Sequence, residues 1–241
     1  FNNLDDEKNI LKKLEADIAI VVAYGQILPK GILHVCKKGF INIHASLLPK
    51  YRGAAPIQRA IINLEKKTGI SIMRMTEKLD SGPVCKIYEL NISEKDSYKT
   101  LSEKLSKLAS QKISENLKNI MDDKIKFTDQ DHKEATYAKK IRKSESLINW
   151  NMPANKILGL INALCPSPGA FFYFEKKRYK ILEAKVSKNI GKVGIVIDNF
   201  LNVGCKENSI KINLIQREGK KPQKTQDFII GSKIKKGSNL N

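Results

Sequence analysis

Apolar and polar positions alternate along the first half of the chain in blocks that predict a layered α/β domain. A continuous apolar run, which is typical of a strand buried on both faces of a parallel sheet, predicts a strand at 17–24 and a second strand of this buried type at 39–44. Two further strands are predicted at 69–75 and 83–92. Proline at the start of a segment or apolar residues at helical spacing predict helices at 6–15, after Pro29, after Pro56 and over 97–121. This alternation of strands and helices indicates an α/β architecture.

The pattern changes in the second half of the chain. Residues 122–143 are polar and charged, as expected of a linker, and a helix is predicted near 153–164. Short alternating runs then follow at intervals of about ten residues, which is typical of a small β-barrel or sandwich; they read AFFYF, KRYKILEAKV, GKVGIVID, FLNVGC and SIKINLIQ. We therefore expect an α/β domain over 1–121, a linker over 122–143 and a β-rich domain over 144–241.

Composition narrows the function classes. The 241 residues carry 44 basic and 25 acidic side chains, and residues 141–241 alone hold 19 basic and 7 acidic ones, a net +12. Such a field attracts polyanions such as nucleic acid, although 38 of the 44 basic residues are Lys and a scattered excess also supports solubility. No apolar run is long enough to cross a bilayer, no leader segment is visible, and the four cysteines lack chelating spacing. We expect a cytoplasmic protein with no membrane partner and no metal.

One cluster of polar residues suits chemistry. Asn42 and His44 are two apart at the end of a predicted strand and so project from the same face, at the edge where open α/β sheets bind ligands. An amide can donate to a developing oxyanion, an imidazole can exchange a proton, and Asp80 from a later turn can orient that imidazole. The same residues are also explained if His44 has a purely structural role and Asp80 only forms a turn. The residues alone therefore define no more than a polar site. Ser46 lacks a nucleophile-elbow context, and no glycine pattern indicates a dinucleotide site.

Three sequence blocks carry a resemblance to a known family. N-I-H-A-S-L-L-P-K-Y-R-G is followed by A-A-P-I-Q-R-A and later by M-T-E-K-L-D-S-G. Together they resemble the folate-dependent formyltransferases, and D-I-A-I-V-V-A-Y-G-Q-I-L-P with T-Y-A-K-K-I is similar to the branch that acts on methionyl-tRNA. The resemblance implies a Rossmann-like domain with a mostly parallel sheet, followed by a small OB-like β-barrel that binds tRNA.

The resemblance also implies a reaction and its residues. It implies transfer of a formyl group from 10-formyltetrahydrofolate to the amino group of methionyl initiator tRNA, for translation initiation, by a monomer that needs no metal. Asn42, His44 and Asp80 match the family's catalytic trio, and Ser46, Leu47, Leu48 and Pro49 match its folate-contacting loop. Candidate tRNA contacts, given as a group, are Lys139, Lys140, Arg142, Lys143, Lys176, Lys177 and Arg178.

Family members normally carry about two further β-α units before the point where this chain begins, so we expect the amino-terminal part of the catalytic domain to lie outside it. Two other functions stay open at this stage. One is a formyltransferase that acts on a small-molecule amine, such as glycinamide ribonucleotide or an amino sugar. The other is an inactive tRNA-binding remnant.

Overall fold

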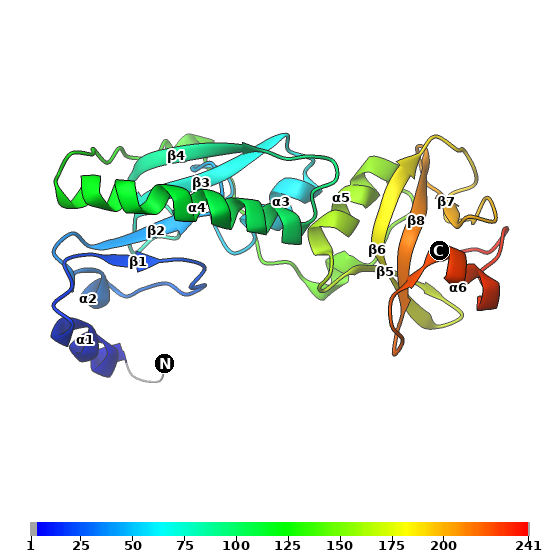
Figure 1. Ribbon diagram of the computed structural model, residues 1–241, viewed down its shortest axis with the longest axis horizontal. Coiled ribbons are helices and arrows are strands. Elements are labelled where there is room, and N and C mark those ends of the chain that lie inside the picture. The colour runs from blue at the N-terminus through cyan, green and yellow to red at the C-terminus, as the bar shows by residue number, and fades with distance from the viewer. Residues whose placement is uncertain (1–3, 241) are drawn as a thin grey trace. The chain divides into compact units, whose positions relative to one another are not determined.

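The computed structural model describes residues 4–240 of the chain, which separates into two compact units (Figure 1). The first unit comprises Phe1–Ile57, Lys66–Ile92 and Ser102–Lys140, and the second comprises Gln58–Glu65, Ser93–Leu101 and Ile141–Asn241. Each unit contains one sheet, and each is described by itself below.

The first unit is built on a four-stranded sheet in the order β1-β2-β3-β4. Its strands are β1 (Ala19–Val21), β2 (Phe40–His44), β3 (Lys67–Arg74) and β4 (Val84–Asn91). Strand β1 pairs with β2 in parallel, whereas β2 with β3 and β3 with β4 are antiparallel. The α/β domain is therefore confirmed, but the expectation of a mostly parallel sheet is corrected: one pair of the described strands is parallel and two are antiparallel, so the sheet is mixed. Strands β3 and β4 are joined by a loop without a helix, a connection that suits antiparallel neighbours.

Helices cover the two faces of this sheet. Those predicted from the sequence are present as α1 (Leu4–Lys13), α2 (Lys30–Leu33) and α4 (Tyr98–Met121). The helix predicted after Pro56 is also present, as α3 (Pro56–Ile62), but from Gln58 onward it belongs to the second unit. Ile41 and Ile72 point to one face and pack with Ile120 of α4, all three at most 2% exposed. Phe40 points to the other face and packs with Ile32 and Leu33 of α2. Because side chains alternate along a strand, Asn42 and His44 share the Phe40 face.

Strand β1 is shorter and more exposed than its sequence suggests. The apolar run 17–24 predicts burial on both faces, yet the strand spans only Ala19–Val21, with Ile20 45% and Val22 59% exposed. In the described part of the chain β1 is an edge strand that pairs only with β2. An edge position leaves its outer side without a packing partner, which explains the exposure.

The second unit contains an antiparallel sheet in the order β5-β6-β8-β7, with β9 paired to β8. Its elements are η2 (Lys143–Ser146), α5 (Ala154–Leu164), β5 (Ala170–Phe174), β6 (Lys177–Ser187), β7 (Asn202–Gly204), β8 (Ser209–Arg217), β9 (Gln223–Lys224) and α6 (Thr225–Gly231). Trp150 and Phe172 are at most 1% exposed in its core, and the Trp150 indole donates to the Leu240 carbonyl at 3.0 Å. The run GKVGIVID forms isolated bridges instead of a strand. The strand order is an open path, so closure into an OB-like barrel stays a prediction.

The polar segment 122–143 has few helical residues but many contacts. Only η1 (His132–Glu134) and the start of η2 are regular within it. Its first part forms a two-way backbone pairing between Thr128 and Val84, and Tyr137 bridges to Arg52. By its contacts the segment belongs to the first unit as far as Lys140. Backbone pairing therefore holds this stretch, together with Ile125 and Phe127, which pack against the cluster of Ile41, Ile72 and Ile120.

Gly69 tests the close pairing of β3 and β4. A Cβ at this position would lie 2.0 Å from the Tyr88 carbonyl oxygen and 2.6 Å from Leu47 Cδ2. We expect Gly69→Ala to lower the free energy of unfolding by at least about 2 kcal/mol, because the backbone of β4 must move. Gly231→Ala, where nothing lies within 4 Å of the added carbon, is the matched control and should change it by less than about 1 kcal/mol. Urea unfolding measures both, and equal midpoints for the two variants would contradict the packing described.

Glu145 gives a pH-dependent prediction in the second unit. Arg59 donates to both Glu145 carboxylate oxygens, at 2.6 and 3.0 Å, and with the Arg142 backbone N–H it lowers the pKa of that carboxyl to about 2. A lowered pKa stabilises the fold fully above the unfolded value of about 4.3, and this stabilisation is lost as the pH falls through the folded value. Glu145→Gln should therefore reduce the free energy of unfolding at pH 7, and the difference from the parent should shrink between about pH 4.5 and 2. Glu103→Gln, at an exposed site on α4, should show no such trend; a pH-independent difference for Glu145→Gln would count against the ion pair.

Candidate active site

Strand β2 places two polar side chains on one face of the sheet in the first unit. Asn42 lies opposite Met73 of β3, and His44, the last residue of β2, lies opposite Ser71. His44 is 6% exposed, while Asn42 is half-buried and so reachable from solvent. The spacing of two residues thus has the predicted effect of aligning the amide and the imidazole.

The Asp80 carboxylate meets both of these side chains. Its Oδ1 accepts from Asn42 Nδ2 at 3.4 Å, and its Oδ2 lies 3.7 Å from His44 Nδ1. The Gly53 backbone N–H also donates to Oδ2, at 2.8 Å. The structure therefore brings the three predicted residues together, and it adds a backbone donor from the loop after β2.

The contacts of His44 fix which ring nitrogen carries a hydrogen. Nε2 lies 2.9 Å from the Tyr51 carbonyl oxygen, which can only accept, so Nε2 donates to it. Nδ1 is left facing Asp80 at 3.7 Å, beyond hydrogen-bond distance. The ring can therefore gain or release its second proton at Nδ1, either toward the carboxylate or toward a ligand beside it.

Two of the residues that hold this geometry have left-handed backbone conformations. Asp80 has a φ of 45° and Tyr51 a φ of 61°. The left-handed region costs a non-glycine residue about 1–2 kcal/mol, so surrounding contacts must hold each residue there. For Tyr51 these include the Thr136 hydroxyl, which accepts from its N–H at 2.9 Å. Gly53, with a φ of 118°, sits where a Cβ would lie 2.9 Å from the Ala138 carbonyl oxygen.

The loop after β2 contains the predicted folate-contacting residues, and its side chains alternate in exposure. Ser46 is 1% exposed and donates to the Lys50 carbonyl at 2.6 Å, and Leu48 is 4% exposed. The Ser71 hydroxyl donates to the Ser46 carbonyl at 2.7 Å and accepts from the Leu48 N–H at 3.0 Å. Leu47 and Pro49 are half-buried. Ser46 and Leu48 thus shape the loop from inside, whereas Leu47 and Pro49 offer side-chain surface to a ligand.

Segment 122–140 supplies site residues that the sequence analysis missed. Arg52 exchanges two backbone hydrogen bonds with it, donating to Thr136 at 2.9 Å and accepting from Ala138 at 2.7 Å. The Gln130 side chain, 8% exposed, reaches the Asp80 turn, and the Arg52 guanidinium contacts His132 Nδ1 at 3.0 Å. The only signal available was the unusual mixture of Gln, His and Thr in a stretch without an apolar pattern.

Cysteine nucleophiles do not fit this protein. Burial raises the pKa of Cys85 and of Cys205 to about 11, and it also raises the pKa of Cys36 and Cys165. All four thiols therefore stay protonated near neutral pH. Within residues 4–240 no three His, Cys, Asp or Glu side chains converge as a metal site. None of the helices described is both long and apolar enough to span a bilayer.

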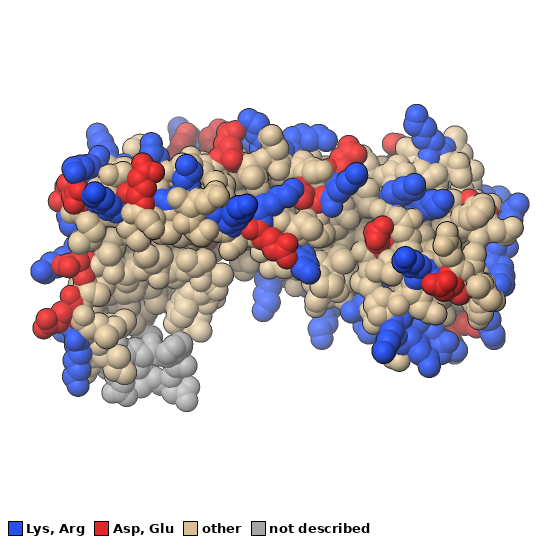
Figure 2. Space-filling view, viewed as in Figure 1, with Lys and Arg blue, Asp and Glu red and all other residues tan. Residues whose placement is uncertain are grey.

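The predicted tRNA contacts lie mainly on the surface. Lys139 and Lys140 are exposed in the first unit, and Arg142 and Lys143 are exposed in the second. Lys176 and Lys177 are exposed at the turn between β5 and β6, where Arg178 places its guanidinium 5.7 Å from the centre of the Phe171 ring. Figure 2 shows Lys and Arg side chains at many places on the surface of the second unit, with acidic side chains between some of them.

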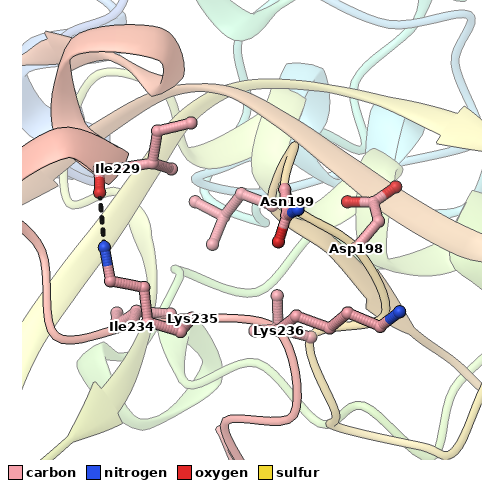
Figure 3. Close-up of a pocket in the computed structure, with 8 residues that line it drawn as sticks. Asp198, Asn199, Ile229, Ile234, Lys235 and Lys236 are labelled. Carbon is pink, nitrogen blue, oxygen red and sulfur yellow. Dashed lines mark hydrogen bonds between the residues drawn. The ribbon is translucent and has the colours of Figure 1, made fainter.

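The second unit also contains a hollow of about 150 Å³ (Figure 3). Val196, Leu201, Ile229 and Ile234 give it an apolar wall, and Lys235 spans it to donate to the Ile229 carbonyl at 2.9 Å. Asp198 at its rim accepts from the Phe200 and Asn202 backbone N–H groups. Its charged groups thus support local loops, and we assign it no chemistry.

The first unit thus combines a mixed α/β sheet with an amide, an imidazole and a carboxylate that meet around one strand end. Comparison with known families defines the class: the chain belongs to the formyl transferase family. The family's "Formyl transferase" model matches residues 3–117, and its "Formyl transferase, C-terminal domain" model matches residues 140–233.

Individual relatives agree with this family. The methionyl-tRNA formyltransferase of Pelagibacter ubique is 58% identical over 98% of this chain and 76% of its own length. Among solved structures, HypX from Aquifex aeolicus in complex with tetrahydrofolic acid gives a TM-score of 0.73 at 18% identity, over 97% of this chain and 42% of its own. The methionyl-tRNA formyltransferase from Clostridium thermocellum gives 0.65 at 22% identity, over 78% and 80% of the two chains. At these identities the structural matches show a shared fold.

Proposed function

We propose that the protein transfers a formyl group from 10-formyltetrahydrofolate to the α-amino group of methionyl initiator tRNA, in the cytoplasm, for translation initiation. The observation that carries this proposal is the convergence of Asn42, His44 and Asp80, in a chain 58% identical to a curated methionyl-tRNA formyltransferase. The identity over nearly the whole chain favours the tRNA acceptor over a small-molecule amine.

The proposed reaction is an addition followed by an elimination at the formyl carbon. The amine of methionine attacks that carbon, and the carbonyl oxygen becomes an oxyanion. When the intermediate collapses, the bond from carbon to the folate nitrogen breaks, that nitrogen takes up a proton, and the amine loses one. The products are formylmethionyl-tRNA and tetrahydrofolate, so no oxidant or metal enters the balance.

Asn42 is proposed to stabilise the oxyanion. One N–H of its amide points to Asp80 Oδ1 at the long distance of 3.4 Å, which leaves the other N–H for a ligand oxygen. Its half-buried position makes this donor reachable while limiting competition from water. An aligned donor to an oxyanion contributes about 3–4 kcal/mol to lowering the barrier.

His44 and Asp80 are proposed to handle the proton. With Nε2 held by the Tyr51 carbonyl, Nδ1 can donate to the oxyanion or, when neutral, accept the proton that the amine releases. The Asp80 carboxylate beside Nδ1 stabilises the charged ring, in the way a buried carboxylate supports histidine in other acyl-transfer sites. The half-buried Leu47 and Pro49 are proposed to contact the folate ring system, on a loop that Ser46 and Leu48 shape from within.

The second unit is proposed to bind the tRNA backbone. Residues 141–241 carry a net +12, and exposed Lys and Arg side chains attract phosphates with a strong salt dependence. Arg142 and Lys143 belong to this unit, and Lys139 and Lys140, at the end of the first unit, extend the candidate set. We also propose that the protein acts as a monomer.

Replacing the oxyanion donor should remove chemistry and spare binding. We expect Asn42→Ala to lower kcat by about 10²–10³-fold, since one donor of this kind is lost, while tRNA affinity stays within threefold. Quench assays of formyl transfer to charged initiator tRNA measure kcat, and Asn91→Ala, at the exposed end of β4, is the matched control. If the parent protein formylates glycinamide ribonucleotide or an amino sugar but not the tRNA, the proposed acceptor is wrong. If the parent protein binds tRNA but shows no saturable binding of a folate analogue, the proposed formyl transfer is wrong.

The basic hairpin should govern the salt dependence of tRNA binding. Replacing Lys176, Lys177 and Arg178 together by Ser should weaken binding at low salt. It should also reduce the slope of log K against log[salt] by about 2–3, close to one per phosphate contact. Filter binding from 50 to 200 mM salt measures the slope. The same change at Lys99, Lys107 and Lys118 on α4 is the charge-matched control, and equal slopes for both triple variants would exclude the hairpin as the contact.

A further inference from the structure

Gln130 connects the segment after α4 to the turn that carries Asp80. Its side-chain amide Nε2 donates to the Asp80 carbonyl at 3.0 Å and to the Gly82 carbonyl at 2.7 Å. Both hydrogens of the amide are thus used on carbonyls two residues apart. These two bonds hold the Asp80–Ser81 and Gly82–Pro83 peptide groups, and so they hold the turn between them.

Arg52 determines the orientation of this amide. Its Nε and Nη2 donate to Gln130 Oε1 at 3.1 and 2.7 Å. A guanidinium has no acceptor, so the amide oxygen must face Arg52 and the amide NH₂ must face the turn. Arg52 is 3% exposed, and none of the described carboxylates contacts it. The Gln130 amide oxygen therefore accepts two of the hydrogen bonds that the buried guanidinium donates. His132 Nδ1 is a second acceptor for Nη2, at 3.0 Å.

The turn held by Gln130 aims the carboxylate at the site. Asp80 has a left-handed φ of 45°, and from this conformation its two oxygens reach Asn42, His44 and the Gly53 N–H. Gly53 directly follows Arg52 in the chain, so the same loop contacts both the carboxylate and the amide that fixes its backbone. Loss of the two carbonyl contacts frees the turn to leave the left-handed region, which moves the carboxylate away from His44.

We propose that Gln130 is a positioning residue for the reaction and acts only through Asp80, with Arg52 orienting its amide. The polar atoms of Gln130 form no hydrogen bond with the side chains of Asn42, His44 or Asp80. Its contact with the site is the hydrogen bond to the Asp80 backbone carbonyl. The inference rests on the proposed formyl transfer for its kinetic readout, and it has a structural readout that does not.

Gln130→Glu is the sharpest single change. It keeps the shape of the side chain and the acceptor for Arg52 but replaces the donating NH₂ by an oxygen that faces two carbonyl oxygens. We expect kcat to fall about 10–100-fold, with KM for folate and for tRNA within threefold, because binding surfaces are unchanged and only the carboxylate is misaligned. Gln130→Met, which removes donor and acceptor together, should lower kcat at least as far.

A matched control separates positioning from general stability. Asn116 is another buried amide of the first unit; it donates to Tyr88 Oη at 2.8 Å and to the Lys112 carbonyl at 2.7 Å, where α4 packs on β4. Asn116→Asp makes the same chemical change away from the site. It should destabilise the protein to urea by an amount comparable to Gln130→Glu and leave kcat within threefold of the parent.

A double-mutant cycle tests the claim that Gln130 acts through Asp80. Single-turnover formyl transfer is measured for the parent, Gln130→Glu, Asp80→Asn and the double variant. We expect the double variant to transfer the formyl group no more slowly than Asp80→Asn alone. Once the Asp80 carboxylate has been removed, the loss of its positioning by Gln130 should not lower the rate further. Multiplied losses, or a Gln130→Glu kcat within threefold of the parent, overturn the proposal.

The crystal structure of Gln130→Glu gives the readout that needs no activity. The proposal expects Asp80 Oδ2 to leave the Gly53 N–H, and an unmoved carboxylate overturns it. A parent protein without formyl transfer would reject the proposed function, and this structural comparison would then decide the positioning claim by itself.

Discussion

The Asp80 carboxylate is the constraint on which the site depends. It accepts from a side-chain amide on β2 and from a backbone N–H in the loop after β2, and it faces the imidazole at 3.7 Å. A buried carboxylate needs several such donors to offset the loss of water. Because these donors come from two parts of the sequence, the carboxylate orders both loops and the strand end between them. The arrangement that satisfies Asp80 is also the one that presents Asn42 to a ligand.

The two faces of the sheet in the first unit differ in the side chains that they carry. Ile41 and Ile72 anchor one face of the sheet under α4, which leaves the opposite face of β2 to polar side chains. The Ser71 hydroxyl on β3 forms two hydrogen bonds with the loop after β2, one to the Ser46 carbonyl and one from the Leu48 N–H. The second unit has its own apolar core around Trp150, and residues 141–241 carry a net +12. The proposed chemistry and the proposed tRNA binding are thus assigned to different units.

Much of this arrangement is readable from the sequence, and the failures have physical causes. Periodicity located α4 and strands β2 to β4 closely, and the spacing of Asn42 and His44 predicted their shared face, since both follow from local geometry. The expectation of a mostly parallel sheet does not hold for these strands, because β3 pairs antiparallel with both β2 and β4, and the apolar pattern of a strand does not reveal its direction. The apolar run around Ile20 predicted two buried faces, whereas an edge strand leaves it 45% exposed.

Long-range hydrogen bonds explain what the sequence could not show. Segment 122–143 has no apolar pattern, so the sequence predicts a linker there. In the structure Thr128 pairs with the backbone of Val84, and Thr136 and Ala138 pair with the backbone of Arg52. Gln130 contributes through an amide whose partners are 48 and 50 residues away, and no spacing rule detects such a contact. Helix α6 (Thr225–Gly231) is also absent from the sequence prediction, because seven residues are too few to show a clear helical period.

The central claim is that the amide and the imidazole gathered by Asp80 hold the carbonyl of a formyl group. A crystal structure of the protein with a stable 10-formyl folate analogue tests it most directly. The account predicts the formyl oxygen within hydrogen-bond distance of Asn42 Nδ2, with His44 Nδ1 and Asp80 beside the formyl carbon. A formyl group bound elsewhere, with these three side chains out of reach of it, would contradict the account.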